Sequence, residues 1–293
     1  MTGKEIAYTN TTNDYPVGVH KWYFVDGKCQ DSKENWRKMN LHACKQNEFI
    51  CKSGDCVNMK HRCDRNYQCK DLSDERNCTF VKPWDYDETA SPPKILTETI
   101  KGGSQELLDI NVAVDILDII GVNEVDSKFE LRFRMEITWN DERLLFISLN
   151  DDERKNIIHN FTNIWIPEIE FINVMNPVQY NLRESNVIIT TYKTEDGILS
   201  GSDDLEKNYI HQGKTVRITK KSTFVGSFLC LFEDIYKYPF DTEVCSIKMV
   251  MIGKNYDFTK LVASNIRYNG KTKFNFMRTS KYPYMVYYDQ YDT

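Results

Sequence analysis

Cysteines are the residues of this chain whose number and spacing point most clearly to covalent chemistry. The sequence holds nine, of which seven fall between Cys29 and Cys78. Such a density suits an oxidising compartment, where cysteines pair as disulfides. A disulfide between the remaining two, Cys230 and Cys245, would enclose fourteen residues and remove about 3 kcal/mol of chain entropy from the unfolded state. Cys29 is the odd cysteine, and it could be free, bridge to another chain or pair with a residue outside this sequence.

Three Asn-x-Thr sequons support the same compartment. They lie at Asn10, Asn77 and Asn160, and a sequon becomes a glycan acceptor only in a secreted protein. The net charge of −5, with both signs interspersed, argues against nucleic acid as a partner because no dense basic stripe is present. We therefore expect an extracellular chain with glycans at these asparagines.

Catalytic motifs are not recognisable, so we expect no enzyme. The five histidines are scattered, and no His-Glu-x-x-His, Gly-x-Ser-x-Gly or phosphate-binding glycine loop occurs. Residues 1–15 lack the apolar core of a signal peptide, and no run approaches the roughly 18 apolar residues that span a bilayer. The strand character of Tyr287 to Thr293 favours a piece of a longer protein. The chain is thus expected to be a soluble binding protein or an ectodomain.

Alternating apolar positions dominate the chain from about Ile95 onward. The clearest strand is Phe129 to Trp139, where six apolar residues alternate with polar ones, so that one face is buried and the other is polar. Further strand-like runs are Ile110–Ile116, Val187–Tyr192, Thr215–Cys230, Cys245–Ile252, Lys273–Thr279 and Tyr284–Tyr288. Many short strands with few helical periods predict a mainly β fold, an immunoglobulin-like β-sandwich.

The rest of the chain is less regular. Trp22 to Val25 is expected to be a strand, and Asp31 to Met39 has helical character. The prolines and acidic residues of Thr79 to Lys94 predict an extended linker, and Thr194 to Asn208 is expected to be a solvated loop. The predicted order is an N-terminal segment (1–43), a small disulfide-rich module (44–78), the linker (79–94) and the β-sandwich (95–293).

The cysteine-rich module has the spacing Cys-x6-Cys-x4-Cys-x6-Cys-x5-Cys-x8-Cys from Cys44 to Cys78, with Phe49 before the second cysteine and Ser73-Asp74-Glu75 near the end. Six cysteines allow fifteen pairings, and the sequence alone does not choose between them. Over its full length the segment resembles a low-density-lipoprotein receptor class A module. This resemblance implies the disulfides Cys44–Cys56, Cys51–Cys69 and Cys63–Cys78.

The same resemblance implies a structural calcium ion. A segment this small cannot bury enough apolar surface to fold unaided, and calcium takes oxygen ligands. The ligands carried over by position are side-chain oxygens of Asp64, Gln68, Asp74 and Glu75 and backbone carbonyls of His61 and Asn66. Because Gln68 stands where the family has aspartate, one negative charge is lost and calcium affinity should fall. The alternative is an acidic surface cluster that binds no metal.

Three further motifs occur in one order along the chain. They are Trp139-Asn140-Asp141-Glu142-Arg143-Leu144, Ile164-Trp165-Ile166-Pro167-Glu168, and the Cys230–Cys245 loop with Tyr238-Pro239-Phe240-Asp241. With them, about Ile95 to Thr293 resembles the ectodomain of Cys-loop receptors, the pentameric ligand-gated ion channels. Glu142 replaces the family's proline, and the loop has fourteen residues where the family usually has thirteen, which we interpret as a local lengthening. Trp139 and Trp165 are also expected to be buried anchors.

Ligands of this family bind between subunits, among aromatic side chains. The resemblance places the principal face at Ile172, beside Asn173, and at Ile252, with a third loop near Tyr282 and Tyr284. Neither isoleucine is aromatic, so the usual cation–π box is not assembled.

The complementary face falls at Arg134 and Glu136, on the polar side of the strand Phe129 to Trp139. Receptors for amino-acid transmitters generally carry arginine at the Glu136 position, whereas this chain carries an acid there. The alternative for both residues is an ion pair within the strand or between subunits, which contributes little if exposed. An atypical ligand, or an orphan subunit, is therefore expected.

The leading hypothesis is the ligand-binding domain of a pentameric channel on the outer face of the plasma membrane, built from identical or related subunits. A small-molecule ligand would bias a closed–open equilibrium. Gly121 to Ser127 and the residues Tyr238, Pro239, Phe240 and Asp241 would carry this bias to a transmembrane domain absent from the chain. The alternative is a secreted pentameric binding protein without a channel.

Overall fold

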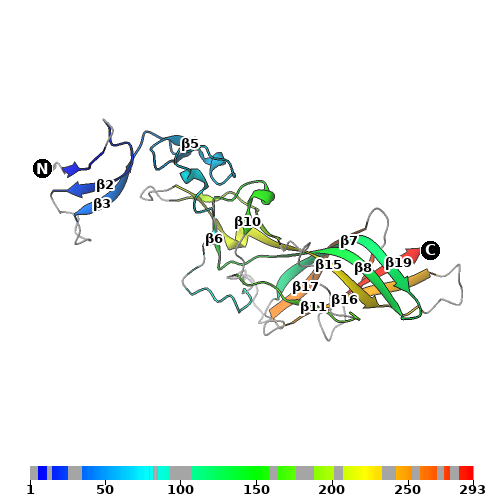
Figure 1. Cartoon of the computed structure of the whole chain (residues 1–293). Coiled ribbons are helices and arrows are strands. Elements are labelled where there is room, and N and C mark those ends of the chain that lie inside the picture. The colour runs from blue at the N-terminus through cyan, green and yellow to red at the C-terminus, as the bar shows by residue number, and fades with distance from the viewer. Residues whose placement is uncertain are drawn as a thin grey trace. The chain divides into compact units, whose positions relative to one another are not determined.

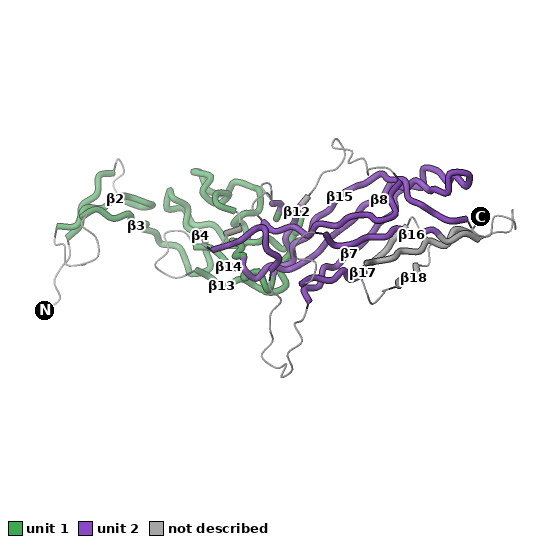
Figure 2. The backbone as a smooth tube through the Cα atoms, turned by 90° about the horizontal axis from the view of Figure 1, so that it is seen from below, with its two compact units in different colours: residues 1–81, 144–156, 192–215 green, residues 82–143, 157–191, 216–293 purple. Residues whose placement is uncertain are grey.

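The computed structural model describes residues 6–11, 15–25, 35–78, 80–81, 83, 85–92, 107–158, 164–175, 188–200, 207–232, 242–252, 258–268, 274–277 and 284–292. Strands and short 3-10 helices make up the regular structure of these residues (Figure 1). None of the described residues belongs to a helix long and apolar enough to cross a membrane. The chain forms two compact units (Figure 2): unit 1 is 1–81, 144–156 and 192–215, and unit 2 is 82–143, 157–191 and 216–293.

Unit 2 contains a six-stranded sheet, of which only Tyr192 and Lys193 belong to unit 1, and a four-stranded sheet. The six-stranded sheet has the order β10-β12-β15-β8-β7-β17, with β7 (Leu108–Asn123), β8 (Lys128–Trp139), β10 (Ile157–Ile158), β12 (Ile188–Lys193), β15 (Val216–Leu229) and β17 (Thr259–Tyr268). The four-stranded sheet has the order β11-β16-β19-β18, with β11 (Ile169–Phe171), β16 (Thr242–Met251), β18 (Phe274–Met277) and β19 (Tyr284–Asp292). Strand β8 is antiparallel to both β7 and β15, whereas β17 is parallel to β7.

The core of the sandwich follows from the alternation along β8. Its six predicted apolar residues are all buried. The ring of Phe133 lies edge-on to Phe171 of β11, with 5.7 Å between centroids, and stacks on Phe224 of β15 at 5.5 Å. Because rings from both sheets meet there, each sheet buries one face against the other. The predicted mainly β fold, with a β-sandwich, is confirmed.

Unit 1 contains the other sheets of the described residues. An antiparallel sheet is formed by β1 (Ala7–Tyr8), β2 (Gly18–Phe24) and β3 (Trp36–Leu41). The cysteine-rich module contains β4 (Glu48–Ile50), β5 (Cys56–Asn58) and the 3-10 helices η1 (Met59–His61) and η2 (Ser73–Glu75). A third sheet has the order β13-β14-β9-β6, with β6 (Phe80–Val81), β9 (Leu145–Ile147), β13 (Ile198–Leu199) and β14 (Tyr209–Gln212), and the 3-10 helices η3 (Glu153–Lys155) and η4 (Gly213–Thr215) adjoin it in the sequence.

The cysteine-rich module has a very small core. Phe49, Cys51, Met59 and Cys69 are buried together, and the partly buried Tyr209 of β14 packs against them. A core of this size depends on cross-links for its stability. The module shares one compact unit with β9 and β14 because Tyr209 extends its core and because β6 pairs with β9.

Three irregular segments contain strands. The helical character expected for Asp31 to Met39 is wrong for Trp36 to Met39, which lie in β3 and pair with β2. The segment Thr79 to Lys94 contains β6, and Thr194 to Asn208 contains β13, which pairs with β14. Each strand is short, and its partner is not adjacent to it in the sequence. Local periodicity therefore gives no sign of the pairing.

Candidate functional site

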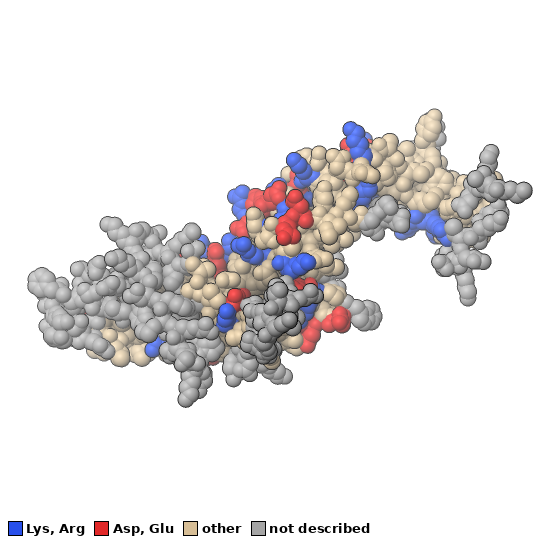
Figure 3. Space-filling view, turned by 180° about the vertical axis from the view of Figure 1, so that it is seen from behind, with Lys and Arg blue, Asp and Glu red and all other residues tan. Residues whose placement is uncertain are grey.

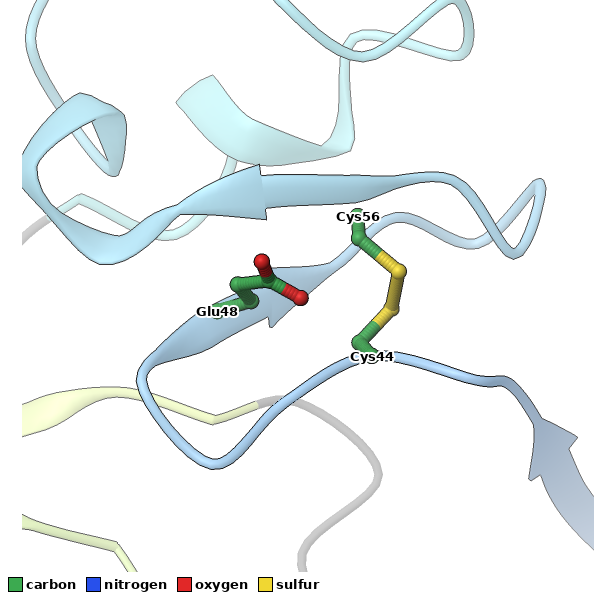
Figure 4. Close-up of side chains that lie close together, drawn as sticks. All are labelled: Cys44, Glu48 and Cys56. Atoms are coloured by element: carbon green, nitrogen blue, oxygen red, sulfur yellow. A yellow bond between two sulfur atoms is a disulfide. The ribbon is translucent and has the colours of Figure 1, made fainter.

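Four disulfides join Cys44 to Cys56, Cys51 to Cys69, Cys63 to Cys78 and Cys230 to Cys245. These are the pairs that the two resemblances imply. Glu48 lies beside the first disulfide (Figure 4), and its Oε2 accepts a hydrogen bond from the backbone N of Lys45 at 2.8 Å. Both neighbouring sulfurs are bonded to each other, so no thiolate is left there for a metal. The group formed by Cys44, Glu48 and Cys56 is therefore not a thiolate metal site.

Asp74 is the most enclosed carboxylate of the module. It is fully buried in η2, and its Oδ2 accepts hydrogen bonds from the backbone N of Gln68 at 2.6 Å and of Cys69 at 3.2 Å. Its Oδ1 is also buried and has no hydrogen-bond partner among the described residues. Burying a carboxylate oxygen without a partner is costly unless a cation contacts it. Asp74 therefore suits a hard cation such as calcium.

Asp64 and Gln68 adjoin Asp74. The Gln68 Nε2 donates to both carboxylate oxygens of Asp64, at 3.3 Å each, and the backbone N of Asn66 donates to Asp64 Oδ1 at 2.8 Å. His61 Nδ1 lies 3.1 Å from Asp64 Oδ2. Burial raises the pKa of Asp64, but these hydrogen bonds outweigh it and hold the pKa below its usual value. Gln68 thus turns its amide nitrogen toward the acid.

Glu75 completes the acidic group. Its Oε1 accepts a hydrogen bond from the backbone N of Asp64 at 2.8 Å. Burial raises the pKa of Glu75, and the charges of Asp64 and Asp74 raise it further. Hydrogen bonds thus link Asp64, Gln68, Asp74 and Glu75: the Gln68 side chain donates to Asp64, and the Asp74 and Glu75 carboxylates accept from the backbone N–H groups of Gln68 and Asp64. These oxygens fit a calcium ion, whose charge would offset the repulsion among the carboxylates.

Arg62 holds this group in place, and sequence reasoning missed it. The guanidinium is buried, stacks on the ring of Phe49 at 4.7 Å and donates to the backbone O of Asp74 and of Arg76. Its Nε donates to Asn208 Oδ1 at 3.1 Å. An arginine next to Cys63 gives no sequence signal of such contacts, because charged residues in small modules are usually solvated.

The motif at Trp139 forms a buried polar network. Asp141 is fully buried, and Arg143 donates to it twice, from Nε to Oδ1 and from Nη2 to Oδ2, at 2.9 Å each. The Tyr86 hydroxyl donates to Asp141 Oδ2 at 3.0 Å and accepts from the backbone N of Trp165 at 2.8 Å. Burial raises the pKa of Tyr86 well above its usual value, and Asp141 adds to this. The network joins two of the three motifs.

Arg134 and Glu136 lie on the outward face of the six-stranded sheet. Arg134 Nη1 is 3.8 Å from Asp115 Oδ2 of β7, and Glu136 Oε1 is 3.5 Å from Lys221 Nζ of β15. Both pairs are cross-strand contacts of partly exposed side chains. On the face shown in Figure 3, acidic and basic side chains are interspersed over the described surface. The structure therefore places both predicted residues in cross-strand ion pairs that are partly exposed to solvent.

Ile172 and Ile252 lie on the outward face of the four-stranded sheet. The backbone N of Ile172 donates to Lys248 O at 2.9 Å, and that of Ile252 donates to Glu168 O at 3.1 Å. This register separates the two isoleucines by four positions, or about 13 Å along the strands. Their side chains are 54% and 40% exposed, which leaves an apolar area open to solvent.

Asn173 has a different environment from its neighbour Ile172. Its Nδ2 donates to Leu229 O at 3.2 Å and to Ser246 O at 2.6 Å, and its Oδ1 accepts from the backbone N of Lys248 at 2.9 Å. Its amide is thus engaged by backbone of β15 and β16. The Asn173 side chain therefore joins the two sheets by hydrogen bonds.

The Cys230–Cys245 disulfide also joins the two sheets. Cys230 directly follows β15 of the six-stranded sheet, and Cys245 lies in β16 of the four-stranded sheet. The backbone N of Cys230 donates to Ser127 O, at the turn between β7 and β8, at 2.9 Å. The base of the disulfide loop is therefore bonded to the predicted coupling segment Gly121 to Ser127.

Several predicted residues cannot be placed in this way. Outside the described residues lie Cys29, Asn160, Tyr238, Pro239, Phe240, Asp241 and Tyr282. Tyr284 begins β19, where its backbone pairs with Val250. Asn10 and Asn77 are exposed, as a glycan acceptor requires.

The buried His211 of β14 should make the free energy of unfolding depend on pH. His211 is 2% exposed, and this burial is the main cause that lowers its pKa. The charge of Lys193 lowers the pKa further, whereas a backbone hydrogen bond at Glu195 and the charges of Asp196 and Asp151 raise it. A histidine whose folded pKa is below its unfolded value of about 6.5 takes up its proton more readily when unfolded. Stability should therefore fall as pH drops below about 6.5, by at most about 1.4 kcal/mol per pH unit.

This expectation is tested by urea unfolding of the wild type and of His211→Phe at several pH values on both sides of about 6.5, the ordinary histidine pKa. The variant should lose less stability on acidification than the wild type. Equal losses in both proteins would show that His211 is not the group responsible.

Two family models match the chain. The neurotransmitter-gated ion-channel ligand binding domain matches residues 85–288, and the low-density lipoprotein receptor domain class A matches residues 42–78. The latter segment lies in unit 1 with the acidic group, and the former includes both sheets of unit 2.

Individual relatives agree with this division. The vitellogenin receptor of Solenopsis invicta is 57% identical over 73 residues, which is 24% of this chain and 4% of the relative. The gamma-aminobutyric acid receptor subunit rho-3 of Homo sapiens is 26% identical over 157 residues, 53% of this chain and 28% of the relative. The proton-gated ion channel of Gloeobacter violaceus is 24% identical over 168 residues, 57% of this chain and 37% of the relative. The chain thus spans well under half the length of these relatives.

The larger match covers more than half of the chain and includes all three motifs, and the family is one of ligand-binding domains rather than of enzymes. With a class A module before it, the chain belongs to the neurotransmitter-gated ion-channel ligand-binding domain family.

Proposed function

We propose that the chain is the extracellular ligand-binding domain of a pentameric ligand-gated ion channel, with an atypical small-molecule ligand bound between identical or related subunits. The observation that carries this proposal is the placement of the predicted ligand residues. Ile172 and Ile252 lie on the outward face of one sheet, and Arg134 and Glu136 lie on the outward face of the other. These faces point away from each other across the sandwich core. A site that uses both needs two chains.

The chemistry of the two faces supports an unusual ligand. The principal face offers exposed aliphatic surface at Ile172 and Ile252, where an aromatic box would hold an amine. The complementary face offers paired charges of both signs at Arg134 and Glu136. A ligand with an apolar body and a polar end suits this combination.

Coupling to a transmembrane pore would start from the base of the disulfide loop. The Cys230–Cys245 bond ties the sheets together, and Cys230 is hydrogen-bonded to the turn at Ser127. A ligand that shifts one sheet relative to the other would therefore move both the Gly121–Ser127 segment and the loop that holds Tyr238, Pro239, Phe240 and Asp241. Such a role requires a membrane-spanning domain outside this chain.

The class A module is proposed to bind a structural calcium ion. Asp64, Asp74 and Glu75 would supply carboxylate oxygens, and Asp74 Oδ1 is the buried oxygen that most needs a cation. His61, Asn66 and Gln68 would complete the coordination. Glycans at Asn10, Asn77 and Asn160 would accompany an extracellular location.

A mixing experiment tests whether the ligand site lies between chains. A ligand is first found by a thermal-shift screen of the assembled protein. Glu136→Ala and Ile252→Ala are then made separately and also co-expressed, because each defect affects a different half of an interface site. Both single-variant assemblies should lose binding about ten-fold or more. Random co-assembly should restore about one quarter of the sites, each formed by the intact halves of two neighbours.

The outcome separates two arrangements. A site within one chain would stay defective in every co-assembled subunit, so an absence of restored sites would contradict the proposal. Glu130→Ala is the matched control, since Glu130 also lies on the polar side of β8 and is not a predicted ligand residue. Its binding should equal that of the wild type.

A further inference from the structure

A pocket of about 860 Å³ lies inside unit 1, between the class A module and the segments around η3 and β14. The module contributes η1, with Lys60 and His61, and the other side contributes Asn150, Lys155 and Lys193. Sites for small molecules in proteins have volumes in this range. None of these residues belongs to the proposed subunit-interface site, so the inference does not depend on that site.

Both walls of the pocket are held by contacts within the protein. Arg62 Nε donates to Asn208 Oδ1 at 3.1 Å, and Arg65 Nε donates to the backbone O of Lys155 at 3.3 Å. Met59 belongs to the core of the module, Tyr209 packs against that core, and both line the pocket. Because two hydrogen bonds and an apolar contact join the walls, a ligand would not have to order them, which favours binding.

The lining of the pocket has an excess of positive charge. Among the residues that line it are three lysines and one arginine (Lys60, Lys155, Lys193 and Arg62) and three aspartates (Asp64, Asp151 and Asp196). Lys193 Nζ lies 2.9 Å from Asp151 Oδ1 and 3.6 Å from Asp196 Oδ1. By contrast, neither Lys60 nor Lys155 forms an ion pair with a residue that the structure describes.

Lys60 lines the pocket from the module, and Asp151 lines it from the other wall. Hydrogen bonding to Lys193 lowers the pKa of Asp151 most, and the charge of Lys60 lowers it further. The positive charge of Lys60, in the module, thus acts on Asp151, which lies next to η3 in the other wall. Lys60 and Lys155 thus line the same pocket from its two walls.

We propose that this pocket binds a small organic acid, with its oxyanion between Lys60 and Lys155 and its apolar part against Met59, Leu149 and Tyr209. Lysine ammonium groups bind carboxylate, sulfate and phosphate oxygens as point charges. The side chains of Asn47, Asn58 and Ser148 line the same pocket and offer hydrogen bonds to the rest of such a ligand. The acid bridges the module and the receptor-domain segments.

Isothermal titration calorimetry of the full chain with benzoate, phenyl sulfate and phenyl phosphate tests this proposal, because the three share one apolar part and differ in the oxyanion. At least one should bind with a dissociation constant below about 10 mM at physiological salt. Benzamide, the uncharged analogue, should bind about ten-fold more weakly or not at all. Lys60→Ala and Lys155→Ala should each weaken binding about ten-fold or more, as expected for a lost charge-assisted hydrogen bond.

Two neighbouring residues serve as matched controls. Lys70, also in the module, is 85% exposed and pairs with Asp55, and Arg154, next to Lys155, is 85% exposed and pairs with Asp152. Neither lines the pocket, so Lys70→Ala and Arg154→Ala should bind like the wild type. Binding by none of the three acids, equal binding of benzamide, or equal losses in the control variants would each overturn the proposal. Near-ultraviolet circular dichroism checks that every variant is folded.

Discussion

Replacing Asp141 by alanine is expected to lower the free energy of unfolding of the receptor domain by about 3–5 kcal/mol, the cost of removing one partner of a buried ion pair. Asp141 is fully buried, and Arg143 and the Tyr86 hydroxyl both donate to it. In the variant a largely enclosed guanidinium loses the carboxylate that accepts its two hydrogen bonds, and the phenol loses its acceptor. Urea unfolding followed by near-ultraviolet circular dichroism measures the change.

The chain contains a matched control for this experiment. Asp152 and Arg154 form a pair of the same Asp-x-Arg spacing, with the same two hydrogen bonds at 2.9 Å each. The Arg154 side chain is 85% exposed, against 20% for Arg143. Since exposed pairs contribute about 0–1 kcal/mol, Asp152→Ala should cost little. Similar losses in both variants would show that burial is not the reason for the importance of Asp141.

Replacing Asp74 by alanine should abolish calcium-dependent stabilisation of the class A module. The change removes the proposed ligand oxygens and leaves the backbone N–H groups of Gln68 and Cys69 without their acceptor, each at a cost of about 1–3 kcal/mol. In the wild type, calcium at a hundred times its dissociation constant should stabilise by about 2.7 kcal/mol. Hydrogen–deuterium exchange of residues 44–78, with and without calcium, reports both effects.

Two further variants sharpen the calcium test. Asp55→Ala removes an exposed carboxylate of the same module, which pairs with Lys70, and should leave calcium binding unchanged. Gln68→Asp adds an acid where the structure turns an amide nitrogen toward Asp64, and it should raise calcium affinity about ten-fold, since ligand charge tunes such sites. A calcium response that persists in Asp74→Ala would contradict the assignment.

The features that sequence reasoning predicted well are those encoded by local spacing. The alternation from Phe129 to Trp139 predicts β8 and its buried face, because a strand places every second side chain on the same side. The order of three short motifs is enough to indicate the family. In each case, residues close in the sequence carry the whole signal.

The features that sequence reasoning missed depend on contacts between residues far apart in the chain. Arg62 reaches Asn208, 146 positions later, and Tyr86 reaches Asp141, 55 positions later. No period or spacing connects such pairs. Asn173 shows the same limit, since a polar residue beside an exposed isoleucine suggests a ligand contact, whereas its amide is engaged by three backbone groups.

The packing of Tyr209 against the core that contains Phe49 and Met59, together with the pairing of β6 with β9, has a consequence for how this gene can vary. A shortened chain that lacks residues 42–78, the segment that the class A model matches, is the simplest such variant. Such a form would uncover the apolar ring of Tyr209 and remove Arg62, the donor to Asn208. The shortened chain should therefore be less stable than the full chain, because it exposes apolar surface that the module covers.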